Sequence, residues 1–543
     1  MAWQMENTSM GLLVLAISFG FFYFIGWYSS RLAKSSTDYW TAGRSIGAVS
    51  NGLGMASTFM SLATFMGVTA LILNLKVPFI YMWMQFALAI PMITLLYGTS
   101  LRRMEAYTPA HFIRERYGVS ASIIIALFLI LIMLMYSLGQ MIGVAKVFEM
   151  LLGIPYEYAL FIGGFLIVGY VTIGGMYGAS YNAAFQMVLM ALTFIIPLGA
   201  IMKAMGSSGW WFPPLAYADM VPAMLEAVPD FFDLQHGVKW YFALIPAFTL
   251  GQMGLPHLAM RVFTSPSLQS ARSAVLWFAF FSGLMFSATY TMGFAGVFFQ
   301  ASTGTTISAT DADKITLILN MAYNPEWVLA LVIAGAIAAG LSTISGNLMA
   351  IGALVAQDII GVFKPNLPDK TQRIIGYVAL ASGGIASVLL AYKPPAFLVV
   401  SILWAFGLAA STSAPLVLTG VWWKEANKYG AIVGSLGGGL AYIITSPYVF
   451  PNIVLGSGLT ANLGMASALF AAPLCFFLLI TVSMITNRIP SLAKSIPMDE
   501  TKRLIDRIHG WADYKEERYN STGGAISIAS ICVVMMVWAL MPW

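Results

Sequence analysis

Charged residues and cysteines are both scarce in this chain. Asp, Glu, Lys and Arg make up only 9% of its 543 residues, whereas hydrophobic residues make up 59%. A soluble globular domain carries about 25% charged residues, so the composition excludes a protein with an ordinary water-facing surface. The two cysteines, Cys475 and Cys532, each lie inside an apolar stretch, which excludes a disulfide framework. The sequence therefore predicts an all-α, polytopic membrane protein.

Residues suited to catalysis or metal binding are also few. The four histidines are scattered along the chain without the spacing of metal ligands, and we find no nucleophile paired with a base. The net charge of +5 is small, so nothing indicates a nucleic-acid partner. These absences argue against an enzyme and leave the lipid bilayer as the first expected partner.

Long apolar runs, by contrast, are abundant. A helix needs about 20 apolar residues to cross the hydrocarbon core of a bilayer. We count about fourteen such runs, at 9–30, 46–74, 77–98, 120–147, 157–176, 181–203, 240–263, 273–299, 325–360, 374–392, 396–422, 429–447, 462–486 and 525–542.

The positive charges are distributed unevenly over the connections between these runs. If residue 1 lies outside, the inner connections carry 21 of the 27 Lys and Arg residues and the outer connections carry 6. Loops on the cytoplasmic side are enriched in Lys and Arg. With an even number of spans, we therefore expect a multi-pass protein of the cell membrane with both termini outside.

Two of the predicted spans contain residues that interrupt helices. The second span has Gly52 and Gly54 among serines and threonines, and the seventh has Gly251, Gly254 and Pro256. In a membrane, an interrupted helix persists only where it lines a cavity or meets other protein. Glycine also allows helices to pack closely, so composition alone leaves both interpretations open.

The two interrupted spans lie five spans apart, which divides the chain into repeats. Because five is odd, the second set of five spans enters the membrane in the opposite sense, as an inverted repeat. We predict a first repeat at 46–204 and a second at 239–423. Residues 1–45 then add an N-terminal helix and inner loop, and residues 424–543 add C-terminal helices with a charged inner loop at 487–524.

The ninth span carries unusual polarity in the stretch "AAGLSTISGNLMA", residues 338–350. Ser342 and Ser345 share one helical face, and Thr343 is adjacent. Such hydroxyls often bond back to carbonyls of their own helix. Together with carbonyls freed by a broken helix, they would also suit a hard monovalent cation. The residues alone do not separate these two interpretations.

Four motifs in order along the chain resemble one family of transporters. The stretch "GIPYEYALFIGGFLIVGYVTIGGM" (153–176) closely resembles the signature of the sodium:solute symporter family, except at Gly178, where Ser, Ala or Pro is usual. The stretches at 36–45, 107–118 and 422–434 resemble further segments of that family.

This resemblance implies a leucine-transporter-type fold with two inverted five-helix repeats, and Na⁺ as the coupling ion. Carried over residue by residue, it implies a sodium site formed by the carbonyls of Ser57, Met60 and Ala339 and the hydroxyls of Ser342 and Thr343. Some relatives bind a second sodium through an aspartate on the span after the signature. Here that region has Asn182 and Ala183, so we expect one sodium.

Within the family, the stretches at 139–154, 251–264 and 408–418 resemble acetate and monocarboxylate permeases. We therefore predict a sodium-coupled symporter that imports a small organic solute, with a monocarboxylate such as acetate favoured, by alternating access. The candidates for binding the solute are Gln140, Gln252 and His257. The positive end of a half-helix would assist them in holding a carboxylate.

Three alternatives stay open at this point. A proton-coupled carrier of the same fold would use His257 as a titrating group. A sodium symporter for an amino acid, a sugar or pantothenate would keep the predicted sodium site and change the solute. A membrane sensor domain would be fused to a signalling module, whereas this chain ends within its last predicted span.

Overall fold

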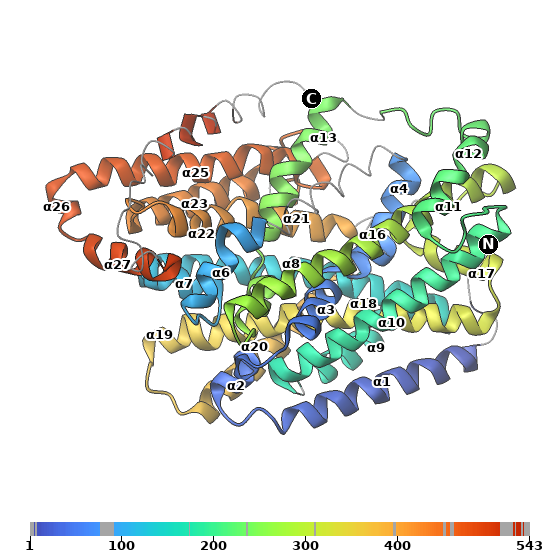
Figure 1. The fold of residues 1–543 in the computed structure, drawn as a ribbon, viewed down its shortest axis with the longest axis horizontal. Coiled ribbons are helices and arrows are strands. Elements are labelled where there is room, and N and C mark those ends of the chain that lie inside the picture. The colour runs from blue at the N-terminus through green and yellow to red at the C-terminus, as the bar shows by residue number, and fades with distance from the viewer. Residues whose placement is uncertain are drawn as a thin grey trace.

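The computed structural model is built from helices arranged around a buried centre (Figure 1). It describes residues 8–76, 92–172, 174–234, 237–308, 311–394, 398–448, 452–456 and 461–510, together with Met5, Ala89 and scattered residues between 525 and 536. In these ranges, eight helices are long and apolar enough to cross a membrane, and a ninth candidate is a bent pair. The predicted spans at 77–98 and 525–542 lie largely outside the described residues.

The predicted first repeat begins with the bent pair. Its helices are α3 (Ala48–Phe59), η2 (Ala63–Val68), α4 (Thr69–Leu75), α8 (Val119–Leu152), α9 (Tyr156–Val171) and α10 (Gly175–Ala204). Two short helices, α6 (Thr99–Arg103) and α7 (Pro109–Tyr117), precede α8. The N-terminal helix α1 (Thr8–Ser30) and the short α2 (Ser36–Thr41) lie outside this set.

The predicted second repeat has the same kind of beginning, a helix in several pieces. Its elements are α13 (Val238–Ile245), η5 (Pro246–Leu250), α14 (Gly251–Met253), α15 (Pro256–Phe263), α16 (Leu268–Thr303), α17 (Ile315–Tyr323), α18 (Glu326–Ala353), η7 (Leu354–Ile360), α19 (Gly361–Phe363), α20 (Asp369–Leu390), α21 (Val399–Ala410) and α22 (Ser413–Trp422). Two short helices, α11 (Pro213–Asp219) and α12 (Val221–Ala227), lie in the connection between the repeats.

The remaining helices follow the second repeat along the chain and pack against it. They are α23 (Lys428–Thr445), α25 (Met465–Arg488), α26 (Pro490–Ala493) and α27 (Met498–His509). α23 packs along α25, and both lie on the side of the molecule opposite α1 (Figure 1). The helix α27 carries charges on one face and apolar residues on the other, within the loop predicted at 487–524.

Burial separates the central helices from the peripheral ones. The spanning window of α21 and α22 is 100% buried and that of α18 is 89% buried, whereas α1 is only 28% buried. α1 exposes large apolar side chains such as Leu13, Ile17 and Phe24, and α9 exposes Phe165. A water-facing surface rarely carries so continuous an apolar band. The periphery is therefore suited to lipid, and α18 and α21 form the core.

Two glycines of the signature motif fix the turn between α9 and α10. Gly174 and Gly175 have φ values of 99° and 56°, which side chains rarely tolerate. A Cβ on Gly174 would lie 2.7 Å from the carbonyl oxygen of Gly26, and one on Gly175 would lie 2.6 Å from the Tyr39 ring. The motif thus brings the turn close to α1 and α2, and α10 begins at Gly175 instead of near residue 181.

The ion pairs between described residues agree with the predicted sides of the connections. They join inner residues to inner ones, and outer residues to outer ones: Arg44–Glu105 and Lys424–Asp506 on the predicted inner side, and Lys76–Asp230, Lys146–Asp313 and Lys314–Glu149 on the outer side. The pairs are compatible with the predicted alternation. The placement of both termini outside stays a prediction.

Candidate functional site

The second predicted span is broken in the structure, at Met60 and Ser61. α3 ends at Phe59, Met60 leaves helical geometry with φ −75° and ψ 61°, and the following helical segment runs at 53° to α3. The glycines of this span do not make the break. Gly52 lies inside α3, where an added Cβ would come within 2.4 Å of Trp277 Cβ on α16. Close packing is therefore the role of Gly52.

The break releases three backbone carbonyls from the helix. In an unbroken helix, the carbonyl of residue i accepts the N–H of residue i+4. The N–H groups that would bond to Ser57, Thr58 and Met60 are bonded elsewhere: Ser61 to Phe59 O at 2.9 Å, Leu62 to Gln140 Oε1 at 3.0 Å, and Thr64 to Ser61 O at 2.9 Å. Three oxygens in a fully buried region are thus free to meet other groups.

Two hydroxyls of α18 meet these carbonyls. Ser342 Oγ donates to Ser57 O at 2.8 Å, and Thr343 Oγ1 donates to Thr58 O at 2.7 Å. The same hydroxyls lie 3.0 and 3.3 Å from Ala339 O in their own helix. The hydroxyls therefore bond back to their own helix and also reach across to α3, and the use of these oxygens by a cation stays a prediction.

This cluster of oxygens has the chemistry of a site for a hard monovalent cation. Its carbonyl and hydroxyl oxygens are neutral, and the side chains of all six residues involved are buried. Hard cations prefer such oxygen ligands. In the described ranges, no group of three or more His, Cys, Asp or Glu residues is placed to hold a metal. Four of the five predicted sodium ligands converge, and Met60 lies at the break beside them.

Ser345 and Gln140 take different positions from this cluster. Ser345 Oγ bonds to Ser342 O at 3.0 Å, within its own helix. Gln140 of α8 accepts a hydrogen bond from the Leu62 N–H through Oε1. Its side chain therefore caps the start of the helical segment that follows the break. Its Nε2 is buried and has no hydrogen-bond partner among the described residues. Gln140 thus presents a free donor at the break.

The seventh predicted span is broken at Gly254 and Leu255. α14 ends at Met253, Leu255 is extended with φ −78° and ψ 122°, and α15 starts at Pro256. Pro256 has no N–H to continue a helical ladder but fits the first position of a new helix. Ser413 Oγ of α22 donates to Gly254 O at 2.7 Å, which holds the break against the core.

Unpaired polar groups gather around this second break. Both ring nitrogens of His257 and both amide atoms of Gln252 are buried without a hydrogen-bond partner among the described residues. The first N–H groups of α15 are orphans of the kind found at every helix start, and they carry the positive end of the helix dipole. The ring of His257 lies 5.3 Å from that of Tyr136, edge to face.

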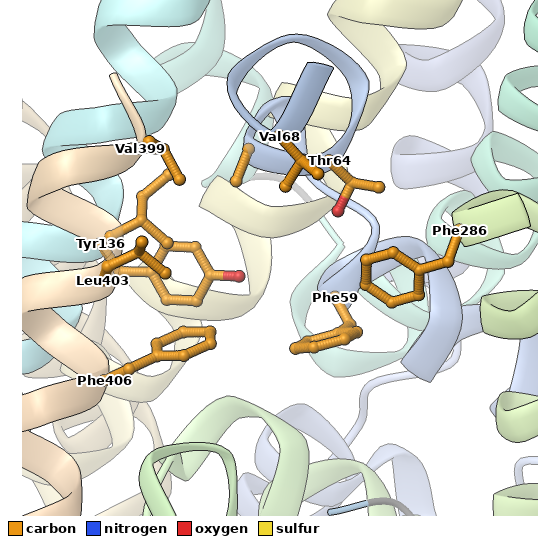
Figure 2. A pocket seen from close by; sticks show the side chains of 10 residues that line it. Phe59, Thr64, Val68, Tyr136, Phe286, Val399, Leu403 and Phe406 are labelled. Atoms are coloured by element: carbon orange, nitrogen blue, oxygen red, sulfur yellow. The ribbon is translucent and has the colours of Figure 1, made fainter. Parts of the chain in front are cut away.

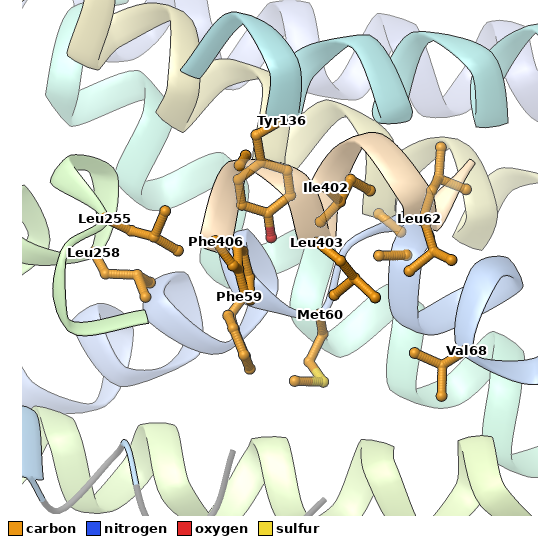
Figure 3. Packing of buried hydrophobic residues seen from close by; sticks show 14 of the residues in the cluster. Phe59, Met60, Leu62, Val68, Tyr136, Leu255, Leu258, Ile402, Leu403 and Phe406 are labelled. Carbon is orange, nitrogen blue, oxygen red and sulfur yellow. The ribbon is translucent and has the colours of Figure 1, made fainter. Parts of the chain in front are cut away.

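A small cavity lies beside the first break (Figure 2). Its lining residues come from α3, η2, α8, α16 and α21: Phe59, Ala63, Thr64, Val68, Tyr136, Phe286, Val399, Ile402, Leu403 and Phe406. Its volume of about 20 Å³ accommodates about one water molecule. Apart from Thr64 and Tyr136, the lining is apolar. Leu255 and Leu258, near the second break, pack in the same buried cluster as Phe59 and Phe406 (Figure 3).

Arg261 is a functional candidate that the sequence alone does not reveal. The structure buries it to 1% exposure on α15. Its guanidinium donates to Ser180 Oγ at 2.8 Å, to Thr58 Oγ1 at 3.1 Å and to Ala179 O at 3.2 Å. No sequence pattern predicts these contacts, because they join three segments that are far apart in the chain.

Comparisons with known proteins agree with this architecture. A family profile described as "Sodium:solute symporter family" matches residues 39–438. A symporter of Bacillus subtilis (strain 168), named "Uncharacterized symporter YwcA", is 29% identical over 462 residues, covering 82% of this chain and 87% of the relative.

Two solved structures are similar in fold. A Na⁺-coupled sialic acid symporter, in a substrate-bound outward-open state, matches with a TM-score of 0.70 and 18% identity over 85% of this chain and 96% of its own. Mhp1, a nucleobase-cation-symport-1 family transporter in a closed conformation, matches with a TM-score of 0.52 and 15% identity over 86% of this chain and 98% of its own. At these identities the likeness concerns the fold alone, which is of the leucine-transporter type.

Proposed function

The chain belongs to the sodium:solute symporter family, and from this premise we propose that it imports a small monocarboxylate, such as acetate, together with sodium. Membership makes it a sodium-coupled solute symporter of the membrane and not an enzyme. The residues that bind the ion and the identity of the solute are the proposal. One observation carries it: the two hydroxyls of α18 meet the carbonyls released at the break of α3.

The sodium site of this proposal consists of Ser57 O, Met60 O, Ala339 O, Ser342 Oγ and Thr343 Oγ1. In the structure the two hydroxyls donate to carbonyls. When Na⁺ is bound, these oxygens coordinate it. The hydroxyls then rotate so that their lone pairs face the ion. The site would hold α3 against α18, two segments from different repeats. Occupancy of this site would thus favour one arrangement of the two repeats over the other.

The carboxylate of the solute is assigned to the donors around the second break. Gln252 and His257 have buried polar atoms without partners in the described part of the chain, and an unpaired buried donor costs about 1–3 kcal/mol. A carboxylate would satisfy these donors and would lie at the positive end of α15. Gln140 Nε2 offers a further donor beside the first break.

The character of the cavity supports a small, mostly apolar solute. Its lining has two hydroxyl-bearing residues, Thr64 and Tyr136, among eight apolar ones. A sugar needs a hydrogen-bond partner for each of several hydroxyls, and an amino acid needs an acceptor for its ammonium group. This lining meets neither need, but its apolar side chains suit the methyl group of a carboxylate such as acetate.

Uptake into proteoliposomes tests the proposal directly. We expect labelled acetate to accumulate when a sodium gradient is directed inward, with pyruvate as a weaker competitor and with proline and glucose without effect. Accumulation driven by a pH gradient and indifferent to sodium would refute sodium coupling. Sodium-driven uptake of proline or glucose in preference to acetate would keep the sodium site and refute the choice of solute.

A further inference from the structure

Arg261 is a buried cation that has no anionic partner among the residues the structure describes. Its side chain is 1% exposed, and all three of its acceptors are neutral: a serine hydroxyl, a threonine hydroxyl and a backbone carbonyl. No carboxylate lies within 4.0 Å of it in the described part of the chain, since none of the ion pairs there includes it. A buried, unpaired charge is strongly destabilising and is a marker of function within a membrane.

The described groups that contact Arg261 are polar and carry no negative charge. Ser180 and Ala179 contribute acceptors from α10, and Thr58 contributes one from α3. The Tyr170 hydroxyl and the amide of Gln186 are buried nearby, and both groups are neutral. Hydrogen bonds to neutral groups orient the guanidinium, but they leave its full positive charge uncompensated.

One residue connects this charge to the proposed sodium site. The side chain of Thr58 accepts from Arg261 Nη2 at 3.1 Å, and the backbone carbonyl of the same residue accepts from Thr343 Oγ1 at 2.7 Å. A cation held by the hydroxyls of Ser342 and Thr343 is therefore separated from the guanidinium by a single threonine. Two like charges roughly 8 Å apart, at an effective dielectric constant of about 20, repel enough to weaken the binding of one by tenfold or more.

Arg261 is also close to the donors proposed for the carboxylate. His257 lies four residues earlier on α15, so the two side chains share one face of that helix. The same face reaches the first break, because a Cβ on Gly346 of α18 would meet both Thr58 and His257. An anion bound at His257 and the start of α15 would lie about one helical turn from the guanidinium and would offset its charge.

We propose that Arg261 is a fixed cation that keeps the sodium site weak until an anionic solute binds beside it. This inference rests on the proposed function, because it takes the sodium site and the carboxylate site as given. The guanidinium repels Na⁺ when the solute is absent. The carboxylate neutralises that repulsion, so each ligand strengthens the binding of the other. Arg261 is thus a positioning residue for coupling and makes no bond to Na⁺.

Binding of radioactive ²²Na⁺ to the purified full chain in lipid nanodiscs tests the proposal. We expect Arg261→Gln to tighten ²²Na⁺ binding about tenfold without acetate and to remove the strengthening that acetate produces in the parent protein. Arg261→Lys keeps the charge and should keep both the weaker binding and the response to acetate. If Arg261 served only to hold the helices together, neither variant would tighten sodium binding.

A second pair of variants changes the charge without removing Arg261. Ser180 contacts Nη1 of the guanidinium at 2.8 Å, so Ser180→Asp places a carboxylate against it and Ser180→Asn is the neutral control of the same size. We expect Ser180→Asp to tighten ²²Na⁺ binding about tenfold and Ser180→Asn to leave it within about twofold. This pair decides the matter even if Arg261→Gln does not fold.

The results separate this inference from the proposed function. Sodium binding that depends on Ser342 and Thr343 but is the same within twofold in the Asp and Asn variants of Ser180 would overturn the role of Arg261 alone. Sodium binding indifferent to Ser342 and Thr343 would overturn the sodium site itself. A tighter Ser180→Asp variant whose sodium binding no longer responds to acetate supports the inference.

Discussion

The two broken helices of this protein present opposite chemistry to the centre of the bundle. At the break of α3, the carbonyls of Ser57, Thr58 and Met60 lose their helical N–H partners, and hydroxyls of α18 donate to the first two. At the break before α15, the free groups are N–H donors and the unpaired side chains of Gln252 and His257. The first break is rich in acceptors and the second is rich in donors.

The difference follows from which end of a helix is exposed. A helix that stops releases carbonyls, and a helix that starts releases N–H groups. In the second span, the hydroxyls of Ser342 and Thr343 contact the end of α3, and Gln140 caps the start of the helical segment that follows. In the seventh span, Ser413 donates to the carbonyl at the end of α14, and the N–H groups at the start of α15 stay uncapped. The same architecture can thus hold a cation at one break and an anion at the other.

Removal of both hydroxyls from α18 should have the largest effect, because it removes the cation site at the first break and leaves only the donor-rich second break. In Ser342→Ala combined with Thr343→Ala, the carbonyls of Ser57 and Thr58 lose their only described partners, and the cation site loses two ligands. We expect sodium-stimulated uptake to fall below detection, more than about a hundredfold. Uptake of acetate at saturating sodium measures this. Normal stimulation in the double variant would remove the site from consideration.

Changes at the second break should affect the solute and leave the ion in place. Gln252→Leu removes the unpaired Nε2 donor that we assign to the carboxylate. Hydrogen bonds to charged groups contribute about 1.5–3 kcal/mol, so the KM for acetate should rise by tenfold or more. Gln252→Glu, which adds a negative charge, should be worse still. An unchanged KM in both variants would contradict the assignment.

The cap at the first break should be needed for stability. Gln140→Leu leaves the Leu62 N–H unsatisfied in a buried position, which we expect to lower the free energy of unfolding by about 1–3 kcal/mol. Thermal unfolding of the purified protein measures the loss. Gln140→Glu keeps the acceptor and serves as the control. Equal stability of the Leu variant and the parent would show that the cap contributes nothing.

The smallest effect is expected at Ser345. Its hydroxyl bonds within α18 to Ser342 O and does not reach the carbonyls of α3. We therefore expect Ser345→Ala to change sodium affinity by less than about twofold and stability by less than about 0.5 kcal/mol. Sodium titration beside Ser342→Ala gives a matched comparison on one helix. A large loss in Ser345→Ala would mean that the site extends further along α18.

Much of the architecture could be predicted from the sequence because apolar runs and loop charges are local signals. The bent second span and the interrupted seventh span were both expected from their composition. The position of the first break was not. Gly52 and Gly54 drew attention, yet they lie within α3, and the break falls at Met60 and Ser61, where no glycine or proline stands.

The candidate site was predictable only in part. Ser342 and Thr343 stood out as hydroxyls in an apolar run, and the family resemblance implied their carbonyl partners. Thr58 O, which accepts from Thr343, was not among the implied ligands. Gln140 was expected to bind solute, whereas in the structure its Oε1 caps a helix and only its Nε2 is free.

The sequence by itself determined that this chain spans a membrane many times, where polarity is concentrated and where helices are weakest. These properties follow from composition along short stretches, which needs no knowledge of neighbours. Only the tertiary structure decided which polar groups meet. The contact of Thr58 with Arg261 joins residues 203 positions apart, and that of Thr343 with Thr58 spans 285. The sign of the charge that each break favours is set by such distant partners, because they decide which end of the broken helix is capped and which end stays open.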